Sequence, residues 1–361
     1  MLSSVQVPEA QVSLAGGAAC PPPAPVSGEV QLGHGSGGKL SARLLKERFL
    51  PHFGNPTLDR LADAAVLPAL PGELVVSTDS FVVSPLEFPG GDIGMLAVHG
   101  TLNDVAMMGA EPFALTAGFV LEEGLPLAVL DRIVASMGRA AREAGVPLVA
   151  GDTKVVERGK ADGMYICTTG LGTRHPAFRP GPDLARAGDV VLVSGPIGSH
   201  GMAIMTVREG LAFEAAIESD TANLVPLMTV LRQAAGRGVH VLRDPTRGGV
   251  ASALNEIAAA SGVGVVLDQY ALPIPGPVEA ACEMLGLDPL YVANEGILLA
   301  FVAPERAEAA LAALRLHPLG RGAARIGTVV ADHPGMVAIR TAIGGMRVVD
   351  MLPGDQLPRI C

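Results

Sequence analysis

The hydrophobic pattern between residues 73 and 172 alternates between short apolar runs and longer stretches with helical periodicity. Two such stretches, at 92–108 and 127–144, predict helices. The apolar runs around them are rich in β-branched residues and predict strands, in the segments ELVVSTDSFVV, PFALTAGFV, VPLVAGDT and MYICTTGLG. The pattern therefore predicts a unit that mixes helices with a sheet.

Each predicted helix has one apolar face. Asp92 stands where a residue would cap the start of the first helix. The second helix places Leu130, Val134, Met137 and Ala141 on one side. We expect both faces to pack against the sheet.

The periodicity lapses at 174–189, where Pro, Gly and Arg accumulate, which is typical of a boundary or a long connection. Further strand-like runs follow, interleaved with predicted helices near 200–209, 222–236, 248–261, 277–286 and 304–315. We therefore expect an α+β chain of two domains, at 29–173 and 174–352. Residues 1–28 are expected to be a disordered extension and residues 353–361, with two prolines, a non-regular tail.

Composition narrows the class of protein. The chain has 361 residues, of which 49% are hydrophobic, and a formal net charge of -10 at pH 7. It is long enough for two cores, and without a Lys/Arg-rich run we expect neither nucleic acid nor an anionic membrane as main partner. The chain has no apolar run of about 18 residues, and its first 28 residues do not match a secretory signal. We expect a cytoplasmic protein.

The four cysteines, Cys20, Cys167, Cys282 and Cys361, lack the close spacing of a zinc site or a disulfide framework. Cys167 lies in an apolar strand pattern and Cys282 on an Ala/Met/Leu helix, so both are expected to be inert buried thiols. The eight histidines show no H-x-x-x-H spacing, so a histidine metal site is not expected. Cys361 is either part of a frayed terminus or a reactive thiol.

The segment GHGSGGK at 33–39 matches the G-x-x-x-x-G-K spacing of a phosphate-binding loop. The match is incomplete, because Leu40 stands where Ser or Thr would bind magnesium and only the short run EVQL precedes the loop. Three interpretations stay open: a true P-loop, a flexible flap that closes over phosphates, and an ordinary loop. In the first two, the nucleotide-binding residues would be Gly35, Ser36, Gly37, Gly38 and Lys39.

Four carboxylates follow apolar runs in turn-like sequences, at Asp63, Asp79, Asp104 and Asp152. Magnesium on a nucleotide needs hard oxygen ligands, and carboxylates from separate elements suit it. Any one of them alone is more often a cap or turn residue. Together they predict a metal–phosphate site, because grouped negative charges need a cation to offset them.

The second predicted domain adds RDPTRGGV, in which Asp244 and Thr246 lead into a helix. The start of this helix could bind a phosphate, or the turn could simply cap the helix. Glu295 comes just before the apolar run ILLAFV, with only Gly296 between them, and Lys154 lies two residues after Asp152. A charged side chain in either place indicates a functional role or a partner of opposite charge.

Taken in order, these motifs resemble the ATP-dependent AIR-synthase-like superfamily, over about residues 30–361. Within it, GHGSGGK, STDSFVVSPLEFPGGDIGMLAVHGTLNDVAMMGAEP, VAGDTKVV, RDPTRGG, NEG and PRIC are similar to the HypE family of hydrogenase-maturation carbamoyl dehydratases. The resemblance implies a mixed-sheet N-terminal domain that forms a homodimer, a larger C-terminal α/β sandwich and a flexible tail. It also implies that ATP and Mg²⁺ bind between the domains.

The resemblance assigns roles to matched residues. Asp63, Asp79, Asp104 and Asp152 become ligands of Mg²⁺ and phosphate, although the family often has two acids where this chain has Ala62 and Asp63. The implied nucleotide neighbours are Lys39, Asn103, Thr153 and Asp244.

The implied reaction is the ATP-dependent dehydration of an S-carbamoyl group on Cys361 to a thiocyanate, which supplies cyanide to the Fe(CN)₂CO centre of [NiFe]-hydrogenase. Phosphorylation would turn the carbamoyl oxygen into a leaving group, and Glu295 or a buried Lys154 would accept a proton. The implied partners are a carbamoyltransferase, HypF, and the HypC–HypD scaffold. Pro358 would stiffen the tail, and Arg359 would supply a cation that favours the Cys361 thiolate.

Two other functions stay open on the residues alone. A small-molecule kinase or synthetase of the same fold, of the selenophosphate synthetase or thiamine-monophosphate kinase type, would turn over without Cys361. A selenophosphate synthetase, however, would carry a reactive cysteine or selenocysteine in its glycine motif, where this chain has Ser36 and Gly37. A non-catalytic nucleotide-responsive scaffold would bind ATP without chemistry at Cys361.

Overall fold

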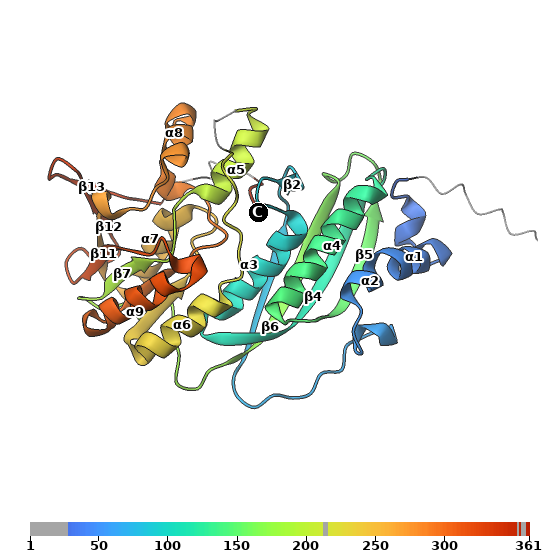
Figure 1. The fold of residues 1–361 in the computed structure, drawn as a ribbon, viewed down its shortest axis with the longest axis horizontal. Coiled ribbons are helices and arrows are strands. Elements are labelled where there is room, and N and C mark those ends of the chain that lie inside the picture. The colour runs from blue at the N-terminus through green and yellow to red at the C-terminus, as the bar shows by residue number, and fades with distance from the viewer. Residues whose placement is uncertain (1–27, 212–215, 352–353, 355–358) are drawn as a thin grey trace, which may run out of the picture.

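The computed structural model describes residues 28–211, 216–351, 354 and 359–361. Most of the extension predicted at 1–28, and Pro358 in the predicted tail, lie outside the described residues. Figure 1 shows two sheet-containing units side by side, with the C-terminus between them.

The first unit is built on a four-stranded sheet in the order β1-β6-β4-β5. Its strands are β1 (Leu74–Phe81), β4 (Ala110–Glu122), β5 (Leu148–Val156) and β6 (Met164–Arg174). β4 and β5 are parallel because helix α4 connects them, whereas β6 is antiparallel to both β1 and β4. A two-stranded ribbon of β2 (Glu87–Phe88) and β3 (Gly91–Asp92) follows β1.

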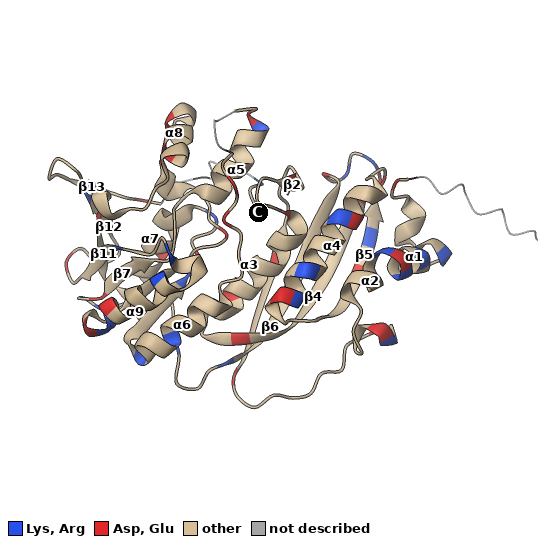
Figure 2. Ribbon diagram, in the orientation of Figure 1, with Lys and Arg blue, Asp and Glu red and all other residues tan. Residues whose placement is uncertain are grey.

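Helices α3 (Ile93–Met107) and α4 (Leu127–Ala144) cover one face of this sheet (Figure 1). The Asp92 carboxylate accepts hydrogen bonds from the main-chain nitrogens of Gly94 and Met95, at 2.8 and 2.9 Å, which confirms the predicted cap. The predicted apolar face of α4 is buried in the core. Figure 2 shows acidic and basic bands on α4, as expected for a helix with one side in solvent.

Short helices precede this sheet. They are α1 (Lys39–Leu44), α2 (Leu50–Phe53), the 3₁₀ turns η1 (Leu32–Gly35) and η3 (Leu58–Arg60), and the π-helical segment η2 (Leu45–Phe49). Figure 1 shows α1 and α2 beside β5, at the end of the first unit away from the second. Phe49 and Phe53 pack their rings against Phe119 of β4, which fixes these helices on the sheet.

The second unit is built on a seven-stranded sheet in the order β13-β12-β9-β11-β7-β10-β8. Its strands are β7 (Val190–Val193), β8 (Val239–Arg243), β9 (Gly264–Asp268), β10 (Leu299–Val302), β11 (Ala324–Val330), β12 (Val337–Arg340) and β13 (Met346–Val348). Its helices are α5 (Ser199–Arg208), α6 (Val225–Ala235), α7 (Gly249–Ser261), α8 (Gly276–Leu285) and α9 (Pro304–Leu316). Short 3₁₀ turns complete it: η4 (Gly236–Gly238), η5 (Gln269–Ala271), η6 (Pro289–Tyr291) and η7 (Pro318–Gly320).

Both faces of this sheet are covered. Val190 and Leu192 of β7 pack in a core with α6 and α9, whereas Val191 and Val193 pack with α7 on the other side. Central strands buried on both faces explain why these segments read as continuous apolar runs rather than as alternating ones. The helix predicted at 222–236 begins later, at Val225, because Ala222 and Leu224 form main-chain hydrogen bonds with Asn103 of α3 instead.

Side chains of α3 fasten the two units together. The Asn103 amide donates to the Ala222 carbonyl oxygen at 2.9 Å and accepts from the Leu224 nitrogen at 2.7 Å. Ala106 and Met107 extend into the core formed by α6 and α9.

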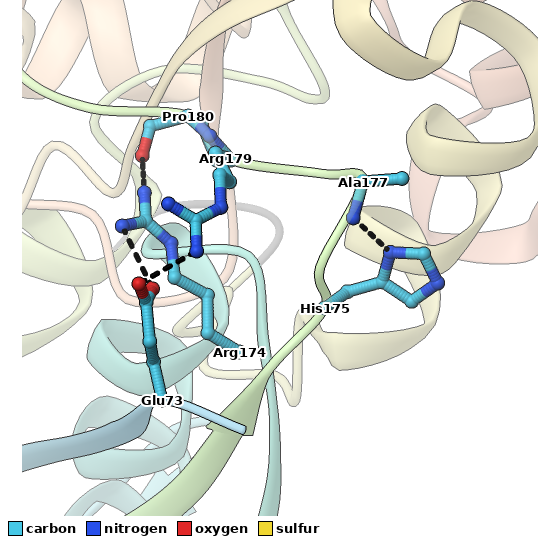
Figure 3. Close-up of polar contacts among 6 residues, drawn as sticks. All are labelled: Glu73, Arg174, His175, Ala177, Arg179 and Pro180. Atoms are coloured by element: carbon cyan, nitrogen blue, oxygen red, sulfur yellow. Dashed lines mark hydrogen bonds and ion pairs between the residues drawn. The ribbon is translucent and has the colours of Figure 1, made fainter.

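The chain between the units is held by charged side chains. Figure 3 shows the Glu73 carboxylate facing the guanidinium groups of Arg174 and Arg179, with closest N–O distances of 3.8 and 2.6 Å. Arg174 also donates to the Pro180 carbonyl oxygen at 2.7 Å. These contacts tie the start of the connection between the two units, after β6, to Glu73, the residue that precedes β1.

Candidate functional site

A cavity of about 510 Å³ lies between the two units, beside the C-terminus. It is lined by the end of β1, by α3, by the β8–α7 connection and by the last three residues of the chain. Its charged and nucleophilic lining includes Asp79, Asp104, Asp244, Arg247, Glu295 and Cys361. Residues from five distant parts of the sequence therefore meet at one place.

The last three residues form strand-like contacts beyond the end of β1. The Val82 nitrogen donates to the Cys361 carbonyl oxygen at 3.1 Å, and the Ser84 nitrogen donates to the Arg359 carbonyl oxygen at 3.3 Å. The side chain between them, Ile360, is buried in the core that includes α5. The terminal thiol is thus brought to the cavity by main-chain pairing and by one apolar anchor.

Carboxyl groups crowd the cavity. Burial raises the pKa of Asp244 to about 7, with Asp104 as the next cause, and it raises the pKa of Asp79 to about 6. The pKa of Asp104 is also raised by burial. Arg243 and Arg247 oppose part of these shifts. Such a group of buried acids favours either a cation or bound protons.

Glu295 is the most buried acid of this cavity, with 2% of its surface exposed. Burial, reinforced by the charges of Asp244 and Asp220, raises the pKa of Glu295 well above its ordinary value. Its Oε1 atom is buried and has no hydrogen-bond partner. A carboxyl group in this state holds its proton more firmly than an ordinary carboxylate does, which suits a group that takes part in general acid–base catalysis.

Asp220 supports the main chain at Glu295. Its two carboxylate oxygens accept from the nitrogens of Glu295 and Gly296, at 3.1 and 3.2 Å. A side chain at Gly296 would overlap the Asp220 carbonyl, so only glycine fits there. The sequence pattern did not indicate Asp220, because an acid in a polar loop carries no signal that it is buried.

A second cavity, of about 400 Å³, lies at the other end of the first unit, between the Gly-rich segment and β5. Gly35, Gly37, Asp63, Asp152, Thr153 and Lys154 are among its lining residues. It shares no lining residue with the first cavity. In one chain the four predicted metal ligands are therefore divided, with Asp79 and Asp104 at one cavity and Asp63 and Asp152 at the other.

The Gly-rich segment packs closely on β5. A Cβ atom at Gly35 would collide with the main-chain nitrogen of Val155, so this glycine permits the approach. Helix α1 begins at Lys39 after Gly38, but a 3₁₀ turn precedes it instead of a buried strand. The structure does not support the interpretation as a true P-loop.

In this chain Lys154 is not the buried lysine that was one of the two candidates for the base. Its side chain is 64% exposed and its Nζ pairs with the Asp152 carboxylate at 2.8 Å. That pairing is the main reason why the pKa of Asp152 is lowered. Lys154 lies on the edge strand β5, where no element among the described residues pairs with its outer side.

The other predicted nucleotide neighbours are placed differently from one another. Thr246 lines the first cavity and Thr153 the second. Asn103 lines neither, because its amide is used between the two units. Ser36 donates to the Gly33 carbonyl oxygen at 2.9 Å, within its own turn.

One expectation about the thiols needs correction. Cys167 is exposed rather than buried, because it lies on the face of β6 away from α3 and α4, with Sγ 3.2 Å from the Ser80 hydroxyl. Arg359 forms an ion pair with Asp162, so its charge is shared with that carboxylate. Cys282 is buried as expected, and burial raises its pKa to about 12.

Within residues 28–211, 216–351, 354 and 359–361, no three His, Cys, Asp or Glu side chains form a preformed metal-binding group. Magnesium usually keeps water and phosphate oxygens in its shell, so two or three carboxylates beside a nucleotide suffice. The raised pKa values of Asp79, Asp104 and Asp244 fit such an ion. No described helix is long and apolar enough to cross a bilayer.

The chain matches two family models, the N-terminal domain of AIR synthase related proteins over residues 61–174 and the C-terminal domain over residues 186–339. It is 56% identical over 335 residues to the carbamoyl dehydratase HypE of Azotobacter vinelandii, covering 93% of this chain and 98% of that relative. The chain belongs to the HypE family. The predicted family and the AIR-synthase-like α+β fold are confirmed.

Solved structures agree. A HypE protein crystallised in complex with ATP has a TM-score of 0.88 and 53% identity, covering 91% of this chain and 99% of that one. A HypE–HypF complex contains a chain with a TM-score of 0.76 and 47% identity, covering 86% of this chain and 99% of that one.

Proposed function

We propose that this chain is an ATP-dependent carbamoyl dehydratase that modifies its own terminal thiol. The substrate is an S-carbamoyl group on Cys361, and the product is an S-cyano group for the Fe(CN)₂CO centre of [NiFe]-hydrogenase. The observation that carries the proposal is that Cys361 and the buried acid Glu295 line the same cavity. Membership of the HypE family supports it.

The reaction balances with one ATP. The carbamoyl oxygen attacks the γ-phosphorus, ADP departs, and phosphate then leaves with that oxygen as S–C≡N forms. The nitrogen loses two protons, of which one ends on phosphate and one is released. Glu295 is proposed to accept a proton from nitrogen, because it lines the same cavity as Cys361 and its raised pKa makes its carboxylate a stronger base than an ordinary one.

The acids that line the cavity beside Cys361 fit a metal–nucleotide complex. Asp79, Asp104 and Asp244 would hold Mg²⁺ together with phosphate oxygens. When bound, Mg²⁺ would offset the negative charge of the transferring phosphoryl group. The Gly-rich segment lines the other cavity of the same chain, so as a flap over these phosphates it would have to come from a second copy.

Lys154 and Glu295 line separate cavities of one chain, so a shared role requires a second copy. We propose a homodimer that forms through the uncovered face of the four-stranded sheet. On that face Leu74 and Val76 of β1 are 63% and 56% exposed, and Cys167 of β6 is exposed as well. A second copy would bury these side chains and could bring its own Lys154 and Asp152 to the first chain's cavity.

Two partners are proposed. A carbamoyltransferase of the HypF type would load Cys361, and a HypC–HypD scaffold would receive the cyanide. The solved HypE–HypF complex supports the first of these. The short C-terminal segment beyond β13 is the part of the chain that such partners would need to reach.

Intact-mass measurement tests the function. The full chain is incubated with its carbamoyltransferase, carbamoyl phosphate and ATP, and its C-terminal peptide is then sequenced by mass spectrometry. A thiocyanate on Cys361, absent from Cys361→Ala and present in Cys167→Ala, is the expected result. A carbamoyl group that persists with ATP present, or a product formed equally by Cys361→Ala, would overturn the proposal.

A further inference from the structure

The C-terminal tripeptide is held by more than the end of β1. The His200 imidazole of α5 contacts the Ile360 carbonyl oxygen through Nε2 at 2.9 Å. The Arg208 guanidinium, at the other end of α5, donates to the carbonyl oxygens of Ser84 and Arg359. Helix α5 therefore bonds two consecutive carbonyl oxygens of the C-terminal main chain, those of Arg359 and Ile360.

His200 is fully buried. A carbonyl oxygen only accepts, so Nε2 must carry the proton that reaches Ile360. Nδ1 of the neutral ring is then an acceptor, and it lies 2.8 Å from the Ser219 hydroxyl, which donates to it. Ser219 Oγ in turn accepts from the Thr221 nitrogen at 3.1 Å.

The three hydrogen bonds form a chain in which each group donates to the next, from the Thr221 N–H to Ser219, from the Ser219 hydroxyl to His200, and from His200 to the Ile360 carbonyl oxygen. Burial lowers the pKa of His200 to about 4, so the ring stays neutral at working pH and offers this single N–H. The edge of the ring also meets Phe88, at a centroid distance of 5.6 Å, which restricts its rotation.

We propose that His200 is a positioning residue that holds the Ile360 peptide and so fixes Cys361 in the cavity, and that Ser219 sets the tautomer of His200. This proposal rests on the proposed function for its catalytic consequence. The positioning role itself does not depend on the proposed function, since the position of the Cys361 thiol can be measured without turnover.

The first test measures how fast iodoacetamide alkylates Cys361 in the full chain, by peptide mapping, with the buried Cys282, which stays unmodified in a folded chain, as the check for unfolding. His200→Phe keeps an aromatic ring against Phe88 but removes the donor. We expect Cys361 to react about fivefold faster in this variant, the change that corresponds to one net hydrogen bond. Ser219→Ala, a milder change, should give about a twofold increase and carries the test if His200→Phe fails to fold.

A matched control is His240→Phe. His240 is also buried and bonds Asp189 at 2.8 Å, in the core of the second unit and not at the tail. It should leave the alkylation rate of Cys361 at the wild-type value. Equal rates in wild type and both tail variants, or an equal rise in His240→Phe, would overturn the proposal.

The second test follows the two half-reactions in the same variants. Carbamoyl transfer to Cys361 should proceed at the wild-type rate or faster, because the tail must be outside to meet the donor, whereas conversion to thiocyanate should slow about fivefold or more. Equal slowing of both steps would indicate a general structural role and contradict the proposal. If wild type forms no thiocyanate, the proposed function fails, yet the alkylation rates still decide the role of His200.

Discussion

The main-chain nitrogen of Val82 donates to the carbonyl oxygen of Cys361 at 3.1 Å. Val82 follows the strand that carries Asp79, so the pairing sets the thiol and that acid at neighbouring positions of one cavity. The structure thus places the last three residues at the cavity, a position that the sequence alone left open.

Replacement of Glu295 by glutamine should abolish proton removal while keeping the shape of the side chain. We expect thiocyanate formation to fall by about 10²-fold or more, the usual contribution of a general base. The variant should fold at least as stably as wild type, because glutamine cannot ionise and so avoids the cost of a buried carboxylate. Single-turnover assays and thermal melts check both parts; near-normal turnover would remove Glu295 from the mechanism.

Stability should fall as pH rises. The pKa values of Asp79 and Asp244, about 6 and 7, are raised above their ordinary range, so the folded chain binds more protons than the unfolded one between about pH 4 and pH 7. Folding is therefore favoured most at the low end of this window and loses on the order of a few kcal/mol across it. Thermal melts at fixed ionic strength measure this, and Asp244→Asn should flatten the profile.

Mg²⁺ should restore the folding stability that is lost as pH rises. If carboxylates of this cavity bind the ion, Mg²⁺ will raise the melting temperature more at pH 8, where they are ionised, than at pH 5, where they hold protons. The comparison is made with and without ATP, using Asp244→Asn as control. A rise of equal size at both pH values would argue against a carboxylate site.

Substitution of Gly35 by alanine should displace the Gly-rich segment from β5, because the new Cβ has no room beside Val155. We expect ATP affinity to drop about tenfold and stability to fall by about 1–3 kcal/mol, as in overpacked sites. Gly276→Ala is the control, since no atom lies within 4 Å of the position that its new methyl group would take at the start of α8. Calorimetric titration with ATP gives the affinities; unchanged binding would leave the segment without a role in it.

Mixing two inactive variants tests the dimer. If Lys154 reaches the cavity of a second copy, a Lys154→Ala chain paired with a Glu295→Gln chain contains one intact site, made of Glu295 and Cys361 from the first and Lys154 from the second. Mixed dimers should regain up to about half of the activity per dimer. If activity does not rise after subunit exchange has been verified, Lys154 and Glu295 do not act at a shared site.

The sequence predicted most elements but could not predict how they group. Asp92 and the apolar face of α4 follow from local rules, and both are found as expected. Asp63 and Asp79 look alike in sequence, yet they lie at different cavities, because topology rather than local pattern sets their neighbours. The prediction for Cys167 was wrong since an uncovered sheet face has the same strand pattern as a covered one.

The tail is part of the fold as well as the carrier of the substrate. When Cys361 travels to a partner, Ile360 leaves its apolar core, which by itself costs about 1.5–3 kcal/mol, and the N–H groups of Val82 and His200 lose their acceptors. A partner that offers only a reactive carbonyl cannot compensate for this loss. Under the proposed function, a donor or acceptor that compensates for this loss would present a pocket for an isoleucine and a strand edge, so recognition would extend to the main chain and to the residue before the cysteine.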